Sequence, residues 1–146
     1  MKKSILIIIL LYGSLNAFEP ESTLKLYHHL LSSIFNKKSV KIYTEDNEYR
    51  KIFLQSKYIK IVLNIKNADF ILITTDTMLE KLKDKKLPKN IIILTNDYHH
   101  MEQLDNILGA FYYRKGRRQF LFLRPRLKEH NITLPLEYDR YIIDEL

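Results

Sequence analysis

The chain has 146 residues, with 24 Lys and Arg against 17 Asp and Glu, a formal net charge of +7 and no cysteine. The absence of cysteine excludes disulfides, thiol catalysis, thiol redox sensing and a cysteine-linked lipid anchor. Three glycines and four prolines are too few for a flexible linker or a low-complexity region. The length fits one domain with a sizeable core, and the basic excess favours anionic partners and surfaces.

Residues 1–17 have the layout of a secretory signal peptide. Two lysines precede an apolar run at 5–11, and a small, polar stretch then ends at Ala17. The apolar run is far shorter than the roughly 20 residues of a transmembrane helix. We therefore predict a periplasmic protein, cleaved near Ala17, whose single domain is 18–146; a buried N-terminal strand is the alternative. Because an exported protein rarely meets nucleic acid, we expect no nucleic-acid partner.

Alternating helix and strand patterns follow in chain order. With Ser22 as the candidate N-cap, apolar residues at helical spacing predict an amphipathic helix that ends near Asn36. Short strands are expected at 40–43 and 59–63, and residues 45–47 open a second, shorter helix between them.

Two continuous apolar runs, at 70–74 and 91–95, have the length of strands. Such runs are typical of strands buried on both faces, as in parallel α/β sheets. A charged helix that starts at Thr75 and Asp76 lies between them and ends before Pro88. This alternation predicts right-handed crossovers and a doubly wound sheet.

The last third of the chain changes character. The elements expected there are strands at 107–113 and 119–123, a hairpin turn at 114–117, a short helix around Leu127 and a last helix bearing Tyr138, Tyr141 and Ile142. Gly116 supplies the positive φ that such a turn often requires. The predicted fold is a single three-layer α/β domain, with a mostly parallel sheet and a C-terminal antiparallel β-hairpin.

Several segments together resemble the YfiR-like family of periplasmic regulators. They read ADFILITT, NIIILTND, GAFYYRKGRRQFLFLRPRL and HNITLPLEYDRYI, and LKLYHHLLSSIF stands in the place of the family's first helix. The resemblance implies a non-enzymatic binder that docks on a membrane-bound signalling partner, typically the periplasmic sensor region of a diguanylate cyclase in cyclic di-GMP signalling. The chain departs from the family in lacking the paired cysteines of some members and in having Arg124 and Pro125 where an Asn is usual.

Four positive charges surround the predicted hairpin turn. Together with one tyrosine beside them, these residues are Tyr113, Arg114, Lys115, Arg117 and Arg118. Arg and Tyr are enriched at protein interfaces. We predict that these five residues bind a partner, as a projecting basic tip for an acidic protein face or lipid headgroups. A solvated turn kept soluble by its charge is the alternative, and peripheral membrane contact and a homodimer both stay open.

Polar side chains follow the two buried strands. Thr75 and Asp76 come after the first, and Asn96 and Asp97 after the second. Because ligands of open α/β sheets bind beyond the carboxyl ends of the strands, these four residues predict a crevice for a small molecule or a metal. The same residue types are the ordinary N-caps of the next helix, which would explain both sets without a ligand. No glycine-rich loop follows either strand, so a phosphate site is not expected.

No catalytic constellation is visible. Histidines occur in two adjacent pairs, at 28–29 and 99–100, and singly at His130. Neighbours on a helix point about 100° apart, so a metal site would need one histidine from each pair, with Asp97 or Glu102. No HExxH motif or GxSxG elbow is present. We assign no catalytic residue, metal ligand or cofactor, and predict that the protein is not an enzyme.

Overall fold

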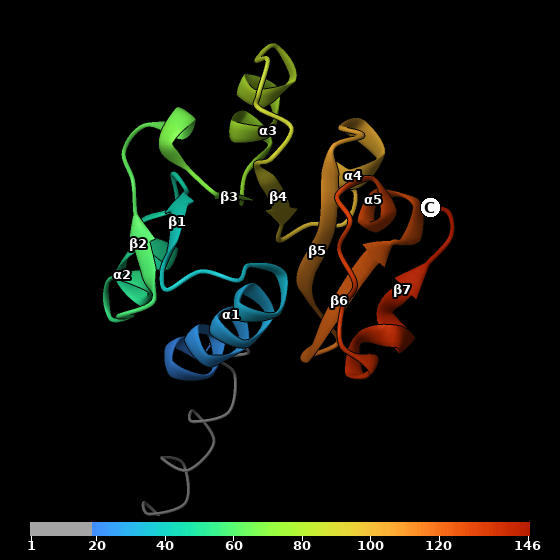
Figure 1. Ribbon diagram of the computed structural model, residues 1–146, viewed down its shortest axis with the longest axis horizontal. Helices are drawn as coiled ribbons and strands as arrows, with labels where there is room; N and C mark the ends of the chain where they lie inside the picture. Colours follow the sequence, from blue (N-terminus) through green and yellow to red (C-terminus); the bar gives the residue numbers. More distant parts are fainter. Residues whose placement is uncertain (1–18) are drawn as a thin grey trace, which may run out of the picture.

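The computed structural model describes residues 19–146, and the signal peptide predicted for residues 1–17 lies outside them. The described residues form one α/β domain around a seven-stranded sheet (Figure 1). The helices, with 3-10 helices marked η, are α1 (Pro20–Ile34), α2 (Asn47–Leu54), η2 (Ile65–Asn67), α3 (Asp76–Lys83), α4 (His100–Gln103), α5 (Arg124–Glu129) and η3 (Leu136–Tyr141). The strands are β1 (Val40–Tyr43), β2 (Ile59–Ile61), β3 (Phe70–Ile73), β4 (Ile92–Thr95), β5 (Ile107–Arg114), β6 (Arg117–Leu123) and β7 (Ile142–Ile143).

The strands lie in the order β2-β1-β3-β4-β5-β6-β7. The first five in this order are parallel, and their sequence 2-1-3-4-5 is one of the common doubly wound arrangements. β6 then pairs antiparallel with β5, and β7 pairs parallel with β6. The predicted class, a mostly parallel sheet with an antiparallel hairpin near the C-terminus, is confirmed. The carboxyl ends of β1, β3 and β4 therefore share one edge of the sheet.

Helices cover both faces of the sheet, which makes three layers. On one face α1 and α2 pack through Tyr27 and Phe53 against Phe70. On the other face α3 packs through Leu79 against Ile71. Neighbouring residues of β3 thus enter opposite cores, and all four of its residues are buried. This is why the strand is continuously apolar in sequence instead of alternating.

Two helices begin where their polar residues predict. Asp46 caps α2, because its Oδ1 accepts hydrogen bonds from the backbone N–H groups of Glu48 and Tyr49. Thr75 caps α3 in the same way, accepting from the Met78 N–H. Both caps lie at the carboxyl edge of the sheet.

The start and the end of the first helix need correction. Ser22 does not cap α1: Glu19 is the N-cap, and Pro20 begins the helix because its fixed φ suits the first turn. The helix ends at Ile34 instead of near Asn36, since Phe35 is already extended.

Two further expectations are wrong in detail. The strand expected at 59–63 ends at Ile61, because the chain turns into η2. The last helix is the 3-10 helix η3, and it stops at Tyr141. Ile142, expected inside that helix, instead pairs with Phe122 and starts β7. Sheet pairing at this edge gives the backbone partners that helix continuation would have supplied.

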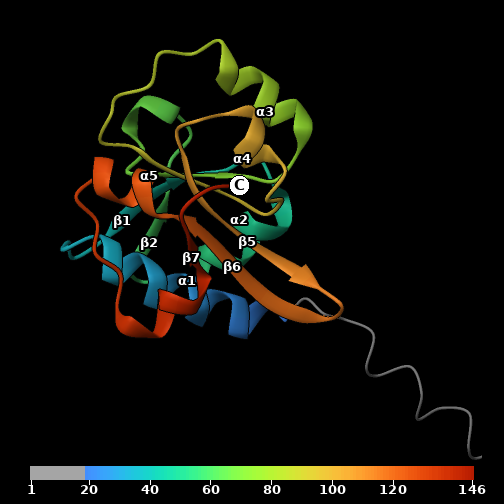
Figure 2. The ribbon, with the colours of Figure 1, turned by 90° about the vertical axis from the view of Figure 1, so that its right-hand side faces the viewer.

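The hairpin of β5 and β6 extends past the helical layers (Figure 2). At its tip Lys115 has φ of 51° and Gly116 has φ of 73°. Positive φ at both central residues is the geometry of a type I′ turn, whose twist matches that of the two strands. The predicted hairpin and the role of Gly116 are confirmed.

Candidate functional site

An open hollow of about 550 Å³ lies at the carboxyl edge of the sheet, beside the ends of β3 and β4. The four residues predicted to bind a ligand, Thr75, Asp76, Asn96 and Asp97, all line it. The fold therefore brings together two polar sets that are about twenty residues apart in the sequence. Tyr113, predicted as a partner-binding residue, lines the same hollow.

A second hollow of about 310 Å³ borders the first. The two share Asn96, Tyr112 and Tyr113, and the second adds Asp46 and Glu48 from the start of α2. Because they share walls, we treat the two hollows as one site and call it the carboxyl-edge groove. It runs along the strand ends from α3 to α2, and β5 forms one of its walls.

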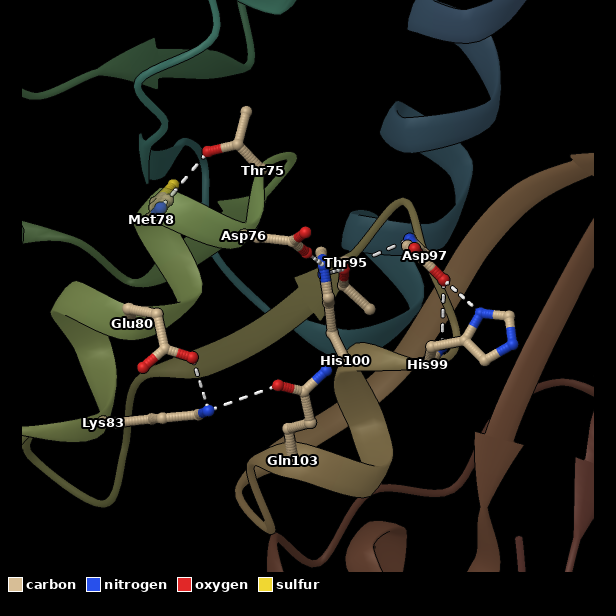
Figure 3. Close-up of polar contacts among 10 residues, drawn as sticks. All are labelled: Thr75, Asp76, Met78, Glu80, Lys83, Thr95, Asp97, His99, His100 and Gln103. Carbon is tan, nitrogen blue, oxygen red and sulfur yellow. Dashed lines mark hydrogen bonds and ion pairs between the residues drawn. The ribbon is translucent and has the colours of Figure 1, made fainter.

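His100, the first residue of α4, contacts both Asp76 at the start of α3 and Thr95 at the end of β4 (Figure 3). Its side chain is only 3 % exposed, its Nδ1 lies 2.6 Å from Thr95 Oγ1, and its Nε2 lies 2.8 Å from Asp76 Oδ1. Thr95 Oγ1 also accepts the Asp97 N–H. The hydroxyl is at the buried end of this chain of contacts and the carboxylate is at the solvent end. The arrangement therefore presents no nucleophile to the groove and instead fixes α3 and α4 to β4.

Asp97 is held by the residue two positions along the chain. Its Oδ1 accepts the His99 backbone N–H at 3.0 Å and lies 2.9 Å from His99 Nδ1 (Figure 3). Partial burial raises the pKa of Asp97, but these hydrogen bonds and the nearby His100 lower it more, and the net pKa lies below its ordinary value. Asp97 is therefore a fixed, negatively charged group.

Aromatic rings stand beside the carboxylates. Tyr98 stacks on His99, with ring centroids 4.1 Å apart, and lies 5.0 Å from the Tyr112 ring. All three rings line the larger hollow. The larger hollow thus has a mostly polar lining, with aromatic ring surface on one side of it.

The predicted hairpin residues divide into two groups. Arg114, Lys115 and Arg117 are exposed at the tip and form no ion pair with any residue of 19–146. Arg118 is half-buried, and its Nη2 donates a hydrogen bond to Ser22 Oγ on α1. With Tyr113 in the groove, only three of the five residues form a free basic tip.

The two histidine pairs do not share a site. His28 stacks on Tyr58, and His29 Nε2 contacts Glu137 Oε1, whereas the other pair lines the groove. Within the described part of the chain, no three His, Asp or Glu side chains are grouped so that they could hold a metal ion.

The sequence reasoning missed Tyr98, His99 and Tyr112 as groove residues, and it read His100 only as one of a pair. The sequence does contain an indication for Tyr98, His99 and His100, which directly follow Asp97. Together with Asp97 they form a polar and aromatic stretch that is longer than a helix cap needs. Tyr112 carries no local signal, because its place in the wall depends on β5 pairing beside β4.

No protein-family model matches the chain, and it matches no curated protein and no solved structure. The resemblance to YfiR-like regulators therefore stays a prediction. Of the helices in residues 19–146, none is long and apolar enough to cross a membrane.

Proposed function

We propose that the protein is an exported, non-enzymatic binding protein that docks on a membrane-bound signalling partner through the tip of its hairpin. The observation that carries the proposal is the projecting group of three exposed cations, Arg114, Lys115 and Arg117, without ion pairs in the described residues. Such a group attracts an acidic protein face and accelerates its association.

The stem of the hairpin supports this role because it is braced against the body. Arg118 is bonded to Ser22 of α1, and Phe120 packs edge-to-face against Tyr138 and Tyr141 of η3, with centroids 5.5 Å away in both cases. A braced stem presents the tip in one orientation, which lowers the entropic cost of binding.

The resemblance to YfiR-like regulators supplies the class of partner, the periplasmic sensor region of a membrane-bound enzyme such as a diguanylate cyclase. Docking would act on that enzyme by binding one of its conformations more tightly than the other. The size of the regulatory effect is then limited by the difference between the two affinities.

Charge reversal at the tip tests the proposal. The variant Arg114→Glu, Lys115→Glu, Arg117→Glu removes the basic tip and leaves the Arg118 bond to Ser22 intact. The control reverses three other exposed lysines, Lys85, Lys86 and Lys89, which gives the same change in net charge away from the hairpin.

The measurement is crosslinking of the full chain in the cells that produce it, with capture and mass spectrometry. We expect the natural chain and the control to capture an inner-membrane protein with a cytoplasmic cyclase or kinase domain, and the tip variant to capture roughly tenfold less, because rim charges act mainly on association. Equal capture by the tip variant, or no such membrane protein in any sample, would overturn the proposal. N-terminal sequencing of the exported chain tests cleavage near Ala17.

A second function is favoured by a separate observation, namely that all four predicted ligand residues line one hollow. We propose that the carboxyl-edge groove binds a small molecule. A ligand that binds only the folded chain raises the melting temperature, and the rise grows with the ligand concentration relative to its Kd, so thermal unfolding of the full chain against a panel of metabolites detects binding. No rise across the panel would contradict this second function.

A further inference from the structure

The carboxyl-edge groove differs in charge from the rest of this basic protein. Its walls contain four acidic residues, Asp46, Glu48, Asp76 and Asp97, and no Lys or Arg of the described chain. The chain as a whole has 24 Lys and Arg against 17 acids. Glu48 is ion-paired with Lys51, which lies outside the lining, whereas Asp46, Asp76 and Asp97 have no Lys or Arg partner among the described residues. The lining of the groove is therefore acidic, in contrast to the chain as a whole.

Three of these carboxylates are positioned by the fold and still have a free oxygen. Asp46 Oδ1 accepts two backbone N–H groups. Asp76 Oδ1 contacts His100, and Asp97 Oδ1 contacts His99. The Oδ2 atom of each makes no hydrogen bond within residues 19–146. Each side chain thus has one oxygen that fixes its direction and a second that is available to a ligand. Asp97 is also held ionised, since its pKa is lowered.

The aromatic part of the wall gives the groove a second way to hold a positive charge. Tyr98 and Tyr112 lie with ring centroids 5.0 Å apart, and Tyr113 borders both hollows. The faces of aromatic rings attract ammonium and guanidinium groups, and they also cover the apolar body of such a molecule. A hollow of about 550 Å³ is within the range of sites that take small organic ligands.

We infer that the carboxyl-edge groove binds an organic cation, a small molecule that carries an ammonium or guanidinium group on an apolar body. This inference rests on the second proposed function and names its ligand class. The free carboxylate oxygens would accept charge-assisted hydrogen bonds from the cationic group. The tyrosine rings would cover the apolar body. An anionic metabolite would meet the carboxylates of Asp46, Asp76 and Asp97 with no Lys or Arg in the lining, so the groove disfavours it.

Calorimetric titration and thermal unfolding of the full chain test the inference. The probes are spermidine, arginine and choline, with glutamate, glucose and MgCl₂ as contrasting compounds at the same ionic strength. We expect at least one organic cation to bind and to raise the melting temperature, and no comparable effect from the contrasting compounds. Asp97→Asn should weaken that binding by roughly tenfold, because it removes one charge-assisted contact.

Asp97→Asn keeps an oxygen that can accept the His99 N–H, so the local turn is preserved. The matched control is Asp84→Asn, which removes one exposed carboxylate at the far end of α3. Binding of glutamate or glucose alone would retain the ligand-binding function and overturn the cationic class. Binding of Mg²⁺ alone, or an organic cation weakened equally by both variants, would also overturn it. No binding of any probe would count against both proposals.

Discussion

His100 Nε2 lies 2.8 Å from Asp76 Oδ1, although the histidine side chain is 3 % exposed and the aspartate side chain is 89 % exposed. The contact joins the start of α4 to the start of α3 across 24 residues of sequence. Through Thr95 it continues to the end of β4. One buried ring thus holds together the two loops that carry the predicted ligand residues.

Replacing His100 should therefore destabilise the protein more than replacing its neighbour. His100→Leu removes both contacts and leaves the buried Thr95 hydroxyl without its histidine partner, so the free energy of unfolding should fall by about 1–3 kcal/mol. His99→Leu changes a side chain that is 60 % exposed and should cost less than about 0.5 kcal/mol. Urea denaturation at neutral pH measures both, and equal losses would contradict the proposed bridge.

The same substitution, Thr to Val, at two buried threonines should have opposite effects on the free energy of unfolding. Thr23 Oγ1 is buried on α1 without a hydrogen-bond partner among the described residues, whereas Thr95 Oγ1 bonds His100 and the Asp97 N–H. Thr23→Val replaces an unsatisfied hydroxyl by a methyl group of similar shape and should stabilise the fold by about 1 kcal/mol. Thr95→Val should destabilise it by about 1–3 kcal/mol.

Thermal and chemical unfolding of the two threonine variants, beside the natural chain, measure the difference. Because both residues are completely buried, differences in solvent exposure do not complicate the comparison. A loss of stability in both variants would mean that the Thr23 hydroxyl has a partner in solution.

The two glycines of the hairpin should respond differently to alanine. A Cβ at Gly109 would lie 2.5 Å from Phe122 Cδ1 and 2.6 Å from the Leu121 carbonyl oxygen, so β5 and β6 would have to separate. Gly109→Ala should lower the free energy of unfolding by about 1–3 kcal/mol, as overpacking of a buried site does. A Cβ at Gly116 would have no atom within 4 Å apart from its chain neighbours, and only the positive φ of 73° opposes a side chain.

Gly116→Ala should therefore cost about 1 kcal/mol, the ordinary penalty of a left-handed conformation. Circular dichroism melting curves of the two glycine variants give the order of stability. A greater loss for Gly116→Ala than for Gly109→Ala would contradict the close approach of the two strands.

Asp69 should make stability depend on pH in the acid range. Its Oδ1 lies 2.6 Å from Lys37 Nζ, and its Oδ2 accepts the Lys41 N–H at 3.0 Å. Partial burial raises the pKa of Asp69, but these bonds and charges lower it more, so the folded-state pKa is below its ordinary value. The resulting stability is present above about pH 4, near the unfolded pKa, and is lost as pH falls through the folded pKa.

Asp69→Asn should accordingly lower the melting temperature at pH 7 and flatten its decline below about pH 4. Asp84→Asn is the control, because Asp84 is exposed and forms no ion pair in residues 19–146. Melting curves from pH 2 to pH 7 measure the effect. Parallel pH profiles for Asp69→Asn and the natural chain would show that the pair with Lys37 contributes nothing.

Local patterns in the sequence predict the kind and order of the main elements. Continuous apolar runs at 70–74 and 91–95 predicted buried parallel strands, and Thr75 and Asp97 marked their carboxyl edge. These predictions succeed because strand burial, helix caps and the turn at Gly116 depend on residues close together in the chain.

The residues that form the groove and the tip come from distant parts of the chain, and the packing of the sheet and helices determines which of them meet. Tyr112 lines the groove because β5 pairs beside β4. His100 lies there because α4 places its ring against Thr95 at the end of β4. Arg118 is not part of the free tip, because it donates a hydrogen bond to Ser22 on α1. Ile142 likewise becomes a strand only because β6 offers a partner. These contacts join residues far apart in the sequence, so no local sequence pattern predicts them. They form only when the packed sheet brings the strands together.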